Sequence, residues 1–249
     1  NAAAINNQNL APRLALAEFF STTGQPDKSI EVLQAILKDV PGNPDAAISL
    51  GNLYLAQRSF DKANAVVGDL LKLYPDLPQG LMLKGRVLLA QNNSGEATSM
   101  LQKAVNIEPD SPAARYYLGI AQLQAKNLQR AEAEWNEAIR NSGRFTPPYI
   151  ALARLKLDSG KPDEAIKHAQ QALKINPKLE DAQLLLGSAY GAKKDYSNAV
   201  MQLEQLVKND PDNLTGILRL GQAYIAQKKA AQAAAQFDKI IAKDSRNVE

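Results

Sequence analysis

The chain repeats itself every 34 residues, and this period constrains its fold more than any other feature of the sequence. One small residue recurs at that step along the 249 residues, at Ala17, Gly51, Gly85, Gly119, Ala153, Gly187 and Gly221. A second follows it at a fixed distance, at Ser29, Ala63, Ala97, Ala131, Ala165, Ala199 and Ala233. A third column is mostly proline, at Pro41, Pro75, Pro109, Gly143, Pro177, Pro211 and Ser245. Three columns that keep phase indicate one structural unit copied along the chain.

Each copy has the pattern of a helical hairpin, as residues 180–213 show. Apolar residues recur there at spacings of three and four, which places Leu186 and Tyr190 on one face of a first helix and Leu203 on one face of a second. Pro211 ends the second helix because proline lacks an N–H and its ring clashes with the preceding turn. One hairpin cannot cover its own apolar face, so the copies are expected to stack. We therefore expect an all-α fold with fourteen complete helices.

These columns resemble the tetratricopeptide repeat (TPR) family, whose 34-residue signature places Leu-Gly, Tyr, Ala and Pro at fixed positions. The second copy carries Gly51, Tyr54, Ala63 and Pro75 at these places. The resemblance implies a TPR solenoid, a right-handed superhelix of seven helix-turn-helix repeats, over residues 10–43, 44–77, 78–111, 112–145, 146–179, 180–213 and 214–247. Residues 1–9 are interpreted as the tail of an incomplete preceding repeat and residues 248–249 as the start of a further one. We therefore expect a segment of a larger TPR protein.

Local features of the repeats give three further expectations. Asp27, with Asp61 and Asp163 in the same slot, is expected to be the N-cap of the second helix of its repeat. The turn between the two helices often has glycine in this family, whereas five repeats here have Arg, Asn or Lys: Arg58, Asn92, Lys126, Lys194 and Lys228. The sole tryptophan, Trp135, is predicted to be a core residue. The fourth repeat ends irregularly, with Gly143, Pro147 and Pro148, and these are expected to alter the angle to the fifth.

Composition and motifs argue against catalysis. The chain has no cysteine, and its only histidine, His168, has no nucleophile or metal-ligand pattern around it and is predicted to be a surface residue. The carboxylates Glu132, Glu134 and Glu137 spread around one helix and indicate a solvated face. No phosphate-binding glycine loop follows a strand. We expect no enzyme activity, no cofactor and no metal. A net charge of +3 gives little attraction for nucleic acid, and no run is long enough to span a membrane.

The resemblance implies a binding surface on the first helix of each repeat, which faces the concave side. Ligand contacts in the family come from repeat positions 2, 5, 9, 12 and 13, counted from the first residue of each repeat. Positions 5 and 12 here are mostly aliphatic. The predicted partner-binding residues are Asn52, Met82, Arg86, Tyr116, Ile120, Gln124, Ile150, Arg154, Asp158 and Leu184. Arg86 and Arg154 predict a partner segment with acidic residues flanking an apolar centre. The clamp for chaperone C-termini is not expected, because Ile48 replaces the lysine it needs.

The leading hypothesis is a noncatalytic scaffold that binds a peptide or helix of a partner protein. Similarity to bacterial multi-TPR proteins suggests a secretion or envelope assembly, by analogy. Two alternatives stay open: a helical-repeat RNA-binding protein of the pentatricopeptide type, and the regulatory arm of an enzyme whose catalytic domain lies outside this segment. The low charge and the 34-residue step favour the scaffold. Uncapped terminal repeats permit end-to-end self-association. Export and a cytoplasmic location are both compatible with the sequence.

Overall fold

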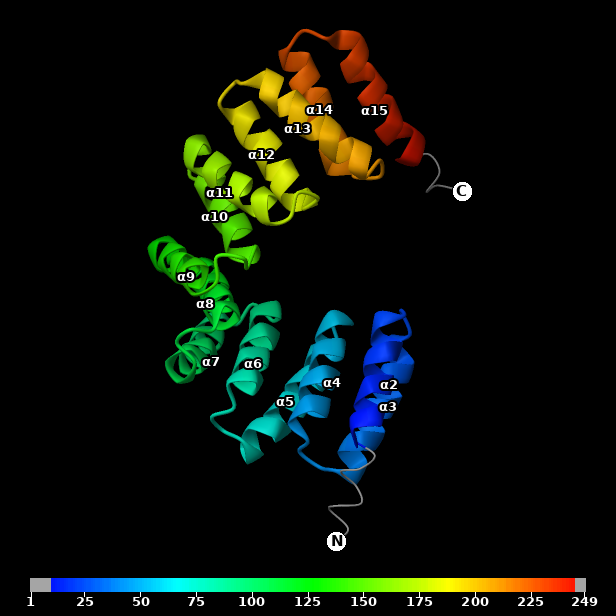
Figure 1. Ribbon diagram of the computed structural model, residues 1–249, viewed down its shortest axis with the longest axis vertical. Helices are drawn as coiled ribbons and strands as arrows, with labels where there is room; N and C mark the ends of the chain where they lie inside the picture. Colours follow the sequence, from blue (N-terminus) through cyan, green and yellow to red (C-terminus); the bar gives the residue numbers. More distant parts are fainter. Residues whose placement is uncertain (1–9, 245–249) are drawn as a thin grey trace. The chain divides into compact units, whose positions relative to one another are not determined.

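The structure, a computed structural model, describes residues 10–244, and within them fourteen α-helices and no strand are found (Figure 1). The all-α prediction is confirmed. The first helices of successive hairpins, called A helices, are α2 (Leu10–Thr22), α4 (Pro44–Ala56), α6 (Pro78–Ala90), α8 (Pro112–Gln124), α10 (Pro147–Asp158), α12 (Glu180–Ala192) and α14 (Leu214–Ala226). The second, or B, helices are α3 (Pro26–Asp39), α5 (Phe60–Leu73), α7 (Ser94–Ile107), α9 (Leu128–Asn141), α11 (Pro162–Ile175), α13 (Tyr196–Asn209) and α15 (Ala230–Asp244). The predicted partial repeats at 1–9 and 248–249 lie outside the described residues.

The chain divides into two units, residues 1–141 and 142–249. The first contains α2 to α9 and the second α10 to α15. Within each unit every helix packs on the next along the chain, and the A helices also contact one another, α4 with α6, α6 with α8, α10 with α12 and α12 with α14. The A helices therefore form a row of direct contacts from α4 to α8 in the first unit and from α10 to α14 in the second, and α2 precedes α4 along the chain. The division falls where the fourth repeat ends irregularly, and the expected change of angle there stays a prediction.

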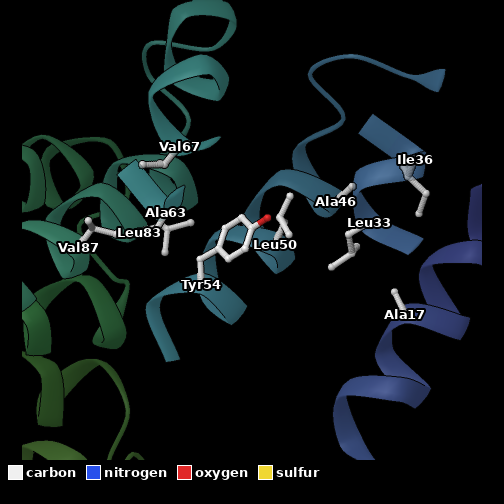
Figure 2. Close-up of a cluster of buried hydrophobic side chains, with 10 residues drawn as sticks. All are labelled: Ala17, Leu33, Ile36, Ala46, Leu50, Tyr54, Ala63, Val67, Leu83 and Val87. Carbon is white, nitrogen blue, oxygen red and sulfur yellow. The ribbon is translucent and has the colours of Figure 1, made fainter. Parts of the chain in front are cut away.

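One cluster of buried side chains in the core of the first unit is shown in Figure 2, and most of its members are small or aliphatic residues. Ala63 is fully buried, and Leu33 and Leu50 are almost so. Tyr54 buries its ring in this cluster, while its hydroxyl accepts a hydrogen bond from Nε2 of Gln34 at 2.8 Å. Aromatic rings of this kind stay in a core because the polar tip reaches a partner at its edge. The residues that recur along the sequence are thus residues that contact one another in the core.

The turns inside the repeats require a left-handed backbone. Gly24 and Gly160 have φ of 74° and 70°, and the five non-glycine residues of the same turn have φ between 58° and 62°: Arg58, Asn92, Lys126, Lys194 and Lys228. This conformation costs an L-residue about 1–2 kcal/mol, because its Cβ approaches the following carbonyl oxygen. Each of these turns is held by backbone hydrogen bonds back to the A helix, such as Asn127 N to Gln122 O at 2.8 Å.

The prediction that Asp27, Asp61 and Asp163 are N-caps is wrong. Each is the second residue of its helix, in α3, α5 and α11, and lies in the first turn. In α3 and α11 a proline occupies the first helical position, where its fixed φ favours helix entry and its missing N–H is not needed. The helices therefore begin one residue before the aspartates. Their carboxylates still interact favourably with the positive end of the helix dipole.

Candidate binding surface

The first unit contains a cavity of about 810 Å³ on its A-helix row, between α2 and α4. Its floor is made by Ala17, Ser29 and Leu33, which are at most 2% exposed. Its walls include residues at repeat positions 2, 5, 9, 12 and 13, namely Ala11, Leu14, Glu18, Ser21, Asp45, Asn52 and Ala56. These are the positions at which the family resemblance predicts ligand contacts. The cavity therefore lies on the surface where a partner is expected.

The second unit contains a cavity of about 460 Å³ in the corresponding place, along α10, α12 and α14. Gly187, Ala199 and Leu203 form its buried floor. The wall residues at the ligand positions are Leu157, Asp158, Ser188, Gly191, Ala192 and Gln222, and Tyr196 and Arg219 also line it. Both the first and the second cavity are therefore lined by A helices.

Small residues at one repeat position open both cavities. Position 12 is aliphatic in five repeats, with Leu55, Leu89, Leu123, Leu157 and Ile225, but it is Ser21 in the first and Gly191 in the sixth. These two exceptions line the first and the second cavity respectively. A Cβ added at Gly191 would meet nothing within 4 Å. The space that an aliphatic side chain could occupy is thus open at both sites.

Asn52 and Arg86, both predicted partner-binding residues, are brought together in the first unit. The Arg86 guanidinium donates to Oδ1 of Asn52 at 2.6 Å and lies 5.0 Å from the ring centre of Tyr117. Both residues stand at position 9, in adjacent repeats, so the bond links α4 to α6. Asn52 lines the first cavity, whereas Arg86 is not among its lining residues. Part of the donor capacity of Arg86 is therefore used inside the protein.

The other predicted residues of the first unit take part in packing inside the protein. The half-buried Met82 and Ile120 pack against the core around Leu118. Gln124 donates from Nε2 to the carbonyl oxygen of Leu89 at 3.3 Å. Tyr116 contacts Tyr117 edge to face, with ring centres 5.2 Å apart, and its carbonyl oxygen accepts from Nε1 of Trp135. Their backbone positions follow the expected row, but the side-chain contacts of Met82, Ile120 and Gln124 and the carbonyl contact of Tyr116 are made with other parts of the protein.

The predicted residues of the second unit divide in the same way. Asp158 lines the second cavity, and Arg154 is exposed on the same helix, α10. The half-buried Ile150 and Leu184 pack against core clusters. The list of predicted residues left out Glu18, Ser21 and Asp45, which line the first cavity, and Ser188, Gly191, Tyr196, Arg219 and Gln222, which line the second. The interruptions of the aliphatic row at Ser21 and Gly191 were the signal that could have located both cavities.

A lysine buried in the second unit replaces the usual aromatic residue of its repeat position. Lys156 is 6% exposed, at the place where Tyr54, Tyr190 and Tyr224 stand in other repeats. Its Nζ lies 2.9 Å from Oε2 of Glu164 at the start of α11. The hydrogen bond from Lys156 holds the pKa of the Glu164 carboxyl below its usual range. This ion pair joins an A helix to a B helix, and neither of its residues lines the second cavity.

Groups suited to metal binding do not come together in the part of the chain that the structure describes. No group of three or more His, Asp or Glu side chains there could hold a metal ion. Glu134 pairs with Arg115 at 3.0 Å and Glu137 pairs with Arg140, so these carboxylates of α9 contribute to ion pairs. His168, predicted at the surface, is partly buried and interacts with other groups, which corrects that prediction. Among residues 10–244, no helix combines the length and apolar character needed to cross a membrane.

Trp135 is a core residue, as predicted. It is 0% exposed, and its Nε1 donates to the carbonyl oxygen of Tyr116 at 3.1 Å. Its position in α9 faces Gly119 in α8, the small residue of the first repeated column. Equivalent contacts occur in the third, sixth and seventh hairpins, so the 34-residue period reflects this helix contact.

Comparisons with known proteins agree with this geometry. A family model described as the tetratricopeptide repeat matches residues 22–87 and 192–248, and another with the same description matches residues 82–145 and 150–213. No curated protein sequence matches the chain.

Solved structures with a similar fold include three repeat proteins. PilW, described as a widely conserved type IV pilus biogenesis factor, is 21% identical and matches with a TM-score of 0.75 over 88% of this chain and 97% of its own. A tetratricopeptide repeat protein from Parabacteroides merdae is 17% identical, with a TM-score of 0.67 over 93% of this chain and 92% of its own. MamA is 23% identical, with a TM-score of 0.56 over 66% of this chain and 90% of its own.

The family models together follow the hairpins from the end of α2 into the last helix, and the solved structures show the same fold. The chain belongs to the tetratricopeptide repeat family.

Proposed function

We propose that the chain is a noncatalytic protein–protein interaction scaffold, and that it holds a segment of a partner protein against its A helices. The observation that carries the proposal is the location of the two cavities. Both are lined by residues at the repeat positions that bind ligands in the family, and both have buried apolar floors with polar groups on their walls. Such sites take apolar side chains of a guest and orient it through a few polar contacts.

A bacterial secretion or envelope assembly is the setting that we propose for this scaffold. The support is the likeness in fold to PilW, a type IV pilus biogenesis factor. In this setting the captured partners would be components of an envelope assembly.

Filling the cavities tests the proposal without removing any charge. In Ser21→Leu and Gly191→Leu an aliphatic side chain takes the place that it has in the other five repeats. Leucine is a better helix former than serine or glycine, so both variants should remain folded. A tagged chain carrying both changes is compared with the wild-type chain as bait in cells, with crosslinking and mass spectrometry as the measurement. We expect the captured partners to be lost.

Gly68→Leu provides the matched control, because Gly68 lies inside the B helix α5 and a Cβ there also meets nothing within 4 Å. This variant should capture the same partners as the wild-type chain. If the cavity variant keeps every partner of the wild-type chain, the A-helix surface is not the binding site.

The predicted arginines have their own test. Arg154→Glu reverses an exposed charge on α10, while Arg86→Glu also breaks the contacts with Asn52 and Tyr117. The pair is compared with Lys103→Glu and Lys174→Glu, which are exposed on the B helices α7 and α11. Weaker capture by the arginine variants alone supports binding through A helices. Weaker capture by the lysine variants alone places the partner on the B helices.

A further inference from the structure

The cavity of the first unit has an apolar floor and an acidic wall. Leu33 and Ala17 are buried beneath it, and the Ser29 hydroxyl, also buried, donates to the carbonyl oxygen of Ala17 at 2.7 Å. Because that hydroxyl already has a hydrogen-bond partner inside the protein, the floor does not need a polar group of the guest to pair with it. A volume of about 810 Å³ accommodates several side chains of a guest segment. The floor therefore favours apolar groups.

The charged residues that line this cavity are both carboxylates. Glu18 on α2 and Asp45 on α4 are exposed on its walls, and the lining includes no lysine or arginine. Neither carboxylate forms an ion pair with another residue of the described chain. Opposite charge on a guest would be attracted here, and a guest with carboxylates or phosphates would be repelled.

Arg86, at the next position of the same row, forms no ion pair with Glu18 or Asp45. Its guanidinium is directed to Oδ1 of Asn52 and to the ring of Tyr117. Because a guanidinium only donates, Asn52 must present its carbonyl oxygen to Arg86, and its NH₂ group can then donate to a guest. A peptide backbone offers carbonyl acceptors for that group. The wall thus combines two carboxylates with one amide donor.

We propose that the cavity between α2 and α4 binds a cationic, amphipathic segment of a partner protein, with apolar side chains on the floor and a lysine or arginine on Glu18 and Asp45. This proposal rests on the proposed function, since it names the class of partner for one of its two cavities. It differs from the sequence-based expectation of acidic residues in the guest. That expectation used Arg86 and Arg154, which belong to different units.

The test uses the full chain and a defined probe, a fluorescein-labelled peptide of leucine and lysine. A length of about 15 residues gives a helix of roughly 22 Å. The comparison probe has glutamate in place of every lysine. Fluorescence anisotropy measures the affinity of each. We expect the lysine probe to bind, the glutamate probe to bind at least about tenfold more weakly, and the difference to shrink in high salt.

Glu18→Gln with Asp45→Asn removes the carboxylates and should weaken the lysine probe about five- to tenfold. The control is Glu31→Gln with Asp61→Asn. Each pair removes two negative charges, one from the interior of a helix and one from the second residue of another. The helices are α2 and α4 in the test pair and α3 and α5 in the control pair. The control should leave the affinity unchanged. Equal weakening by both pairs overturns the proposal, because it would show attraction to the overall charge.

Ser21→Leu separates this proposal from the proposed function. Ser21→Leu should abolish binding of the lysine probe. The control is Ala35→Leu, on the exposed part of α3, which should leave binding unchanged. If Ser21→Leu abolishes binding while the carboxylate pair has no effect, the cavity is a docking site and the cationic class is wrong. If Ser21→Leu has no effect either, the cavity is not a docking site, and the proposed function fails for the first unit.

Discussion

Gly119 of α8 lies directly against the indole of Trp135 in α9. A Cβ on Gly119 would approach Cδ1 of Trp135 to 2.6 Å, well inside van der Waals contact. In the fifth repeat the A-helix residue is larger and the B-helix residue is smaller, because the fully buried Ala153 and Ala169 stand at the places of Gly119 and Trp135. In these two repeats the smaller A-helix residue stands opposite the larger B-helix residue.

This contact predicts that Gly119→Ala destabilises the first unit by about 1–3 kcal/mol, the usual cost of overpacking. The measurement is urea unfolding followed by circular dichroism. Gly68→Ala is the control, since Gly68 in α5 has open space around its Cα. That change should instead stabilise the unit by about 0.5–1 kcal/mol, because alanine loses less backbone entropy than glycine in a helix. Equal effects of the two changes would contradict the contact.

The second repeated column predicts a similar sensitivity at Ala131 and Ala199. Both are at most 1% exposed, on B helices. Ala131→Leu and Ala199→Leu should each lower the melting temperature, since an added side chain in a close-packed contact costs about 1–3 kcal/mol. Lys167→Ala, on the exposed part of α11, should change it little. If all three variants melt alike, the assigned column does not mark the helix contact.

The left-handed turns predict a stabilising change at Lys126, whose φ is 62°. Lys126→Gly should raise the stability by about 0.5–1 kcal/mol, because relief of the Cβ clash exceeds the extra entropy of glycine in the unfolded chain. Gly160→Ala should have the opposite sign at the same turn position, where φ is 70° and space is open. Urea midpoints measure both. A loss of stability in Lys126→Gly would show that its side chain contributes more than the backbone costs.

The Lys156–Glu164 pair predicts a loss of stability in acid. The pKa of Glu164 is lowered in the folded chain from its usual 4.5, mainly by the hydrogen bond from Lys156. The unfolded chain therefore binds this proton more tightly, so the contribution is present above pH 4.5 and is lost as the pH falls through the folded pKa. Glu164→Gln should lower the melting temperature at neutral pH, because Lys156 loses the carboxylate of Glu164, and should flatten the decline in stability as the pH falls below 4.5.

Asp69→Asn is the control for this pair. Its salt bridge with Lys72 is exposed, at 75% and 77% for the two side chains. Exposed pairs contribute little, so the acid profile of this variant should follow that of the wild-type chain. An unchanged profile in Glu164→Gln would contradict the role of the buried lysine.

The fold class, the number of helices and most of the core could be predicted from the amino-acid sequence. A 3.6-residue apolar pattern specifies each helix locally, and the 34-residue step requires each hairpin to pack on its neighbours. Trp135, Ala131 and Ala199 could be predicted to be buried because their columns recur in every repeat. The N-caps of α3 and α11 were misplaced by two residues, at Asp27 and Asp163 instead of Gln25 and Lys161, because capping preferences alone do not fix a helix end.

The open parts of the surface, and the polar groups that remain available to a partner, could be located only in the folded chain. Ser21 and Gly191 are small residues in the sequence, but they open cavities only because the side chains of the neighbouring A helices do not fill the space. Arg86 is a positive residue in the sequence, but in the structure its guanidinium donates to Asn52. Both outcomes depend on contacts between helices about one repeat apart, and a local pattern in the sequence does not encode such contacts.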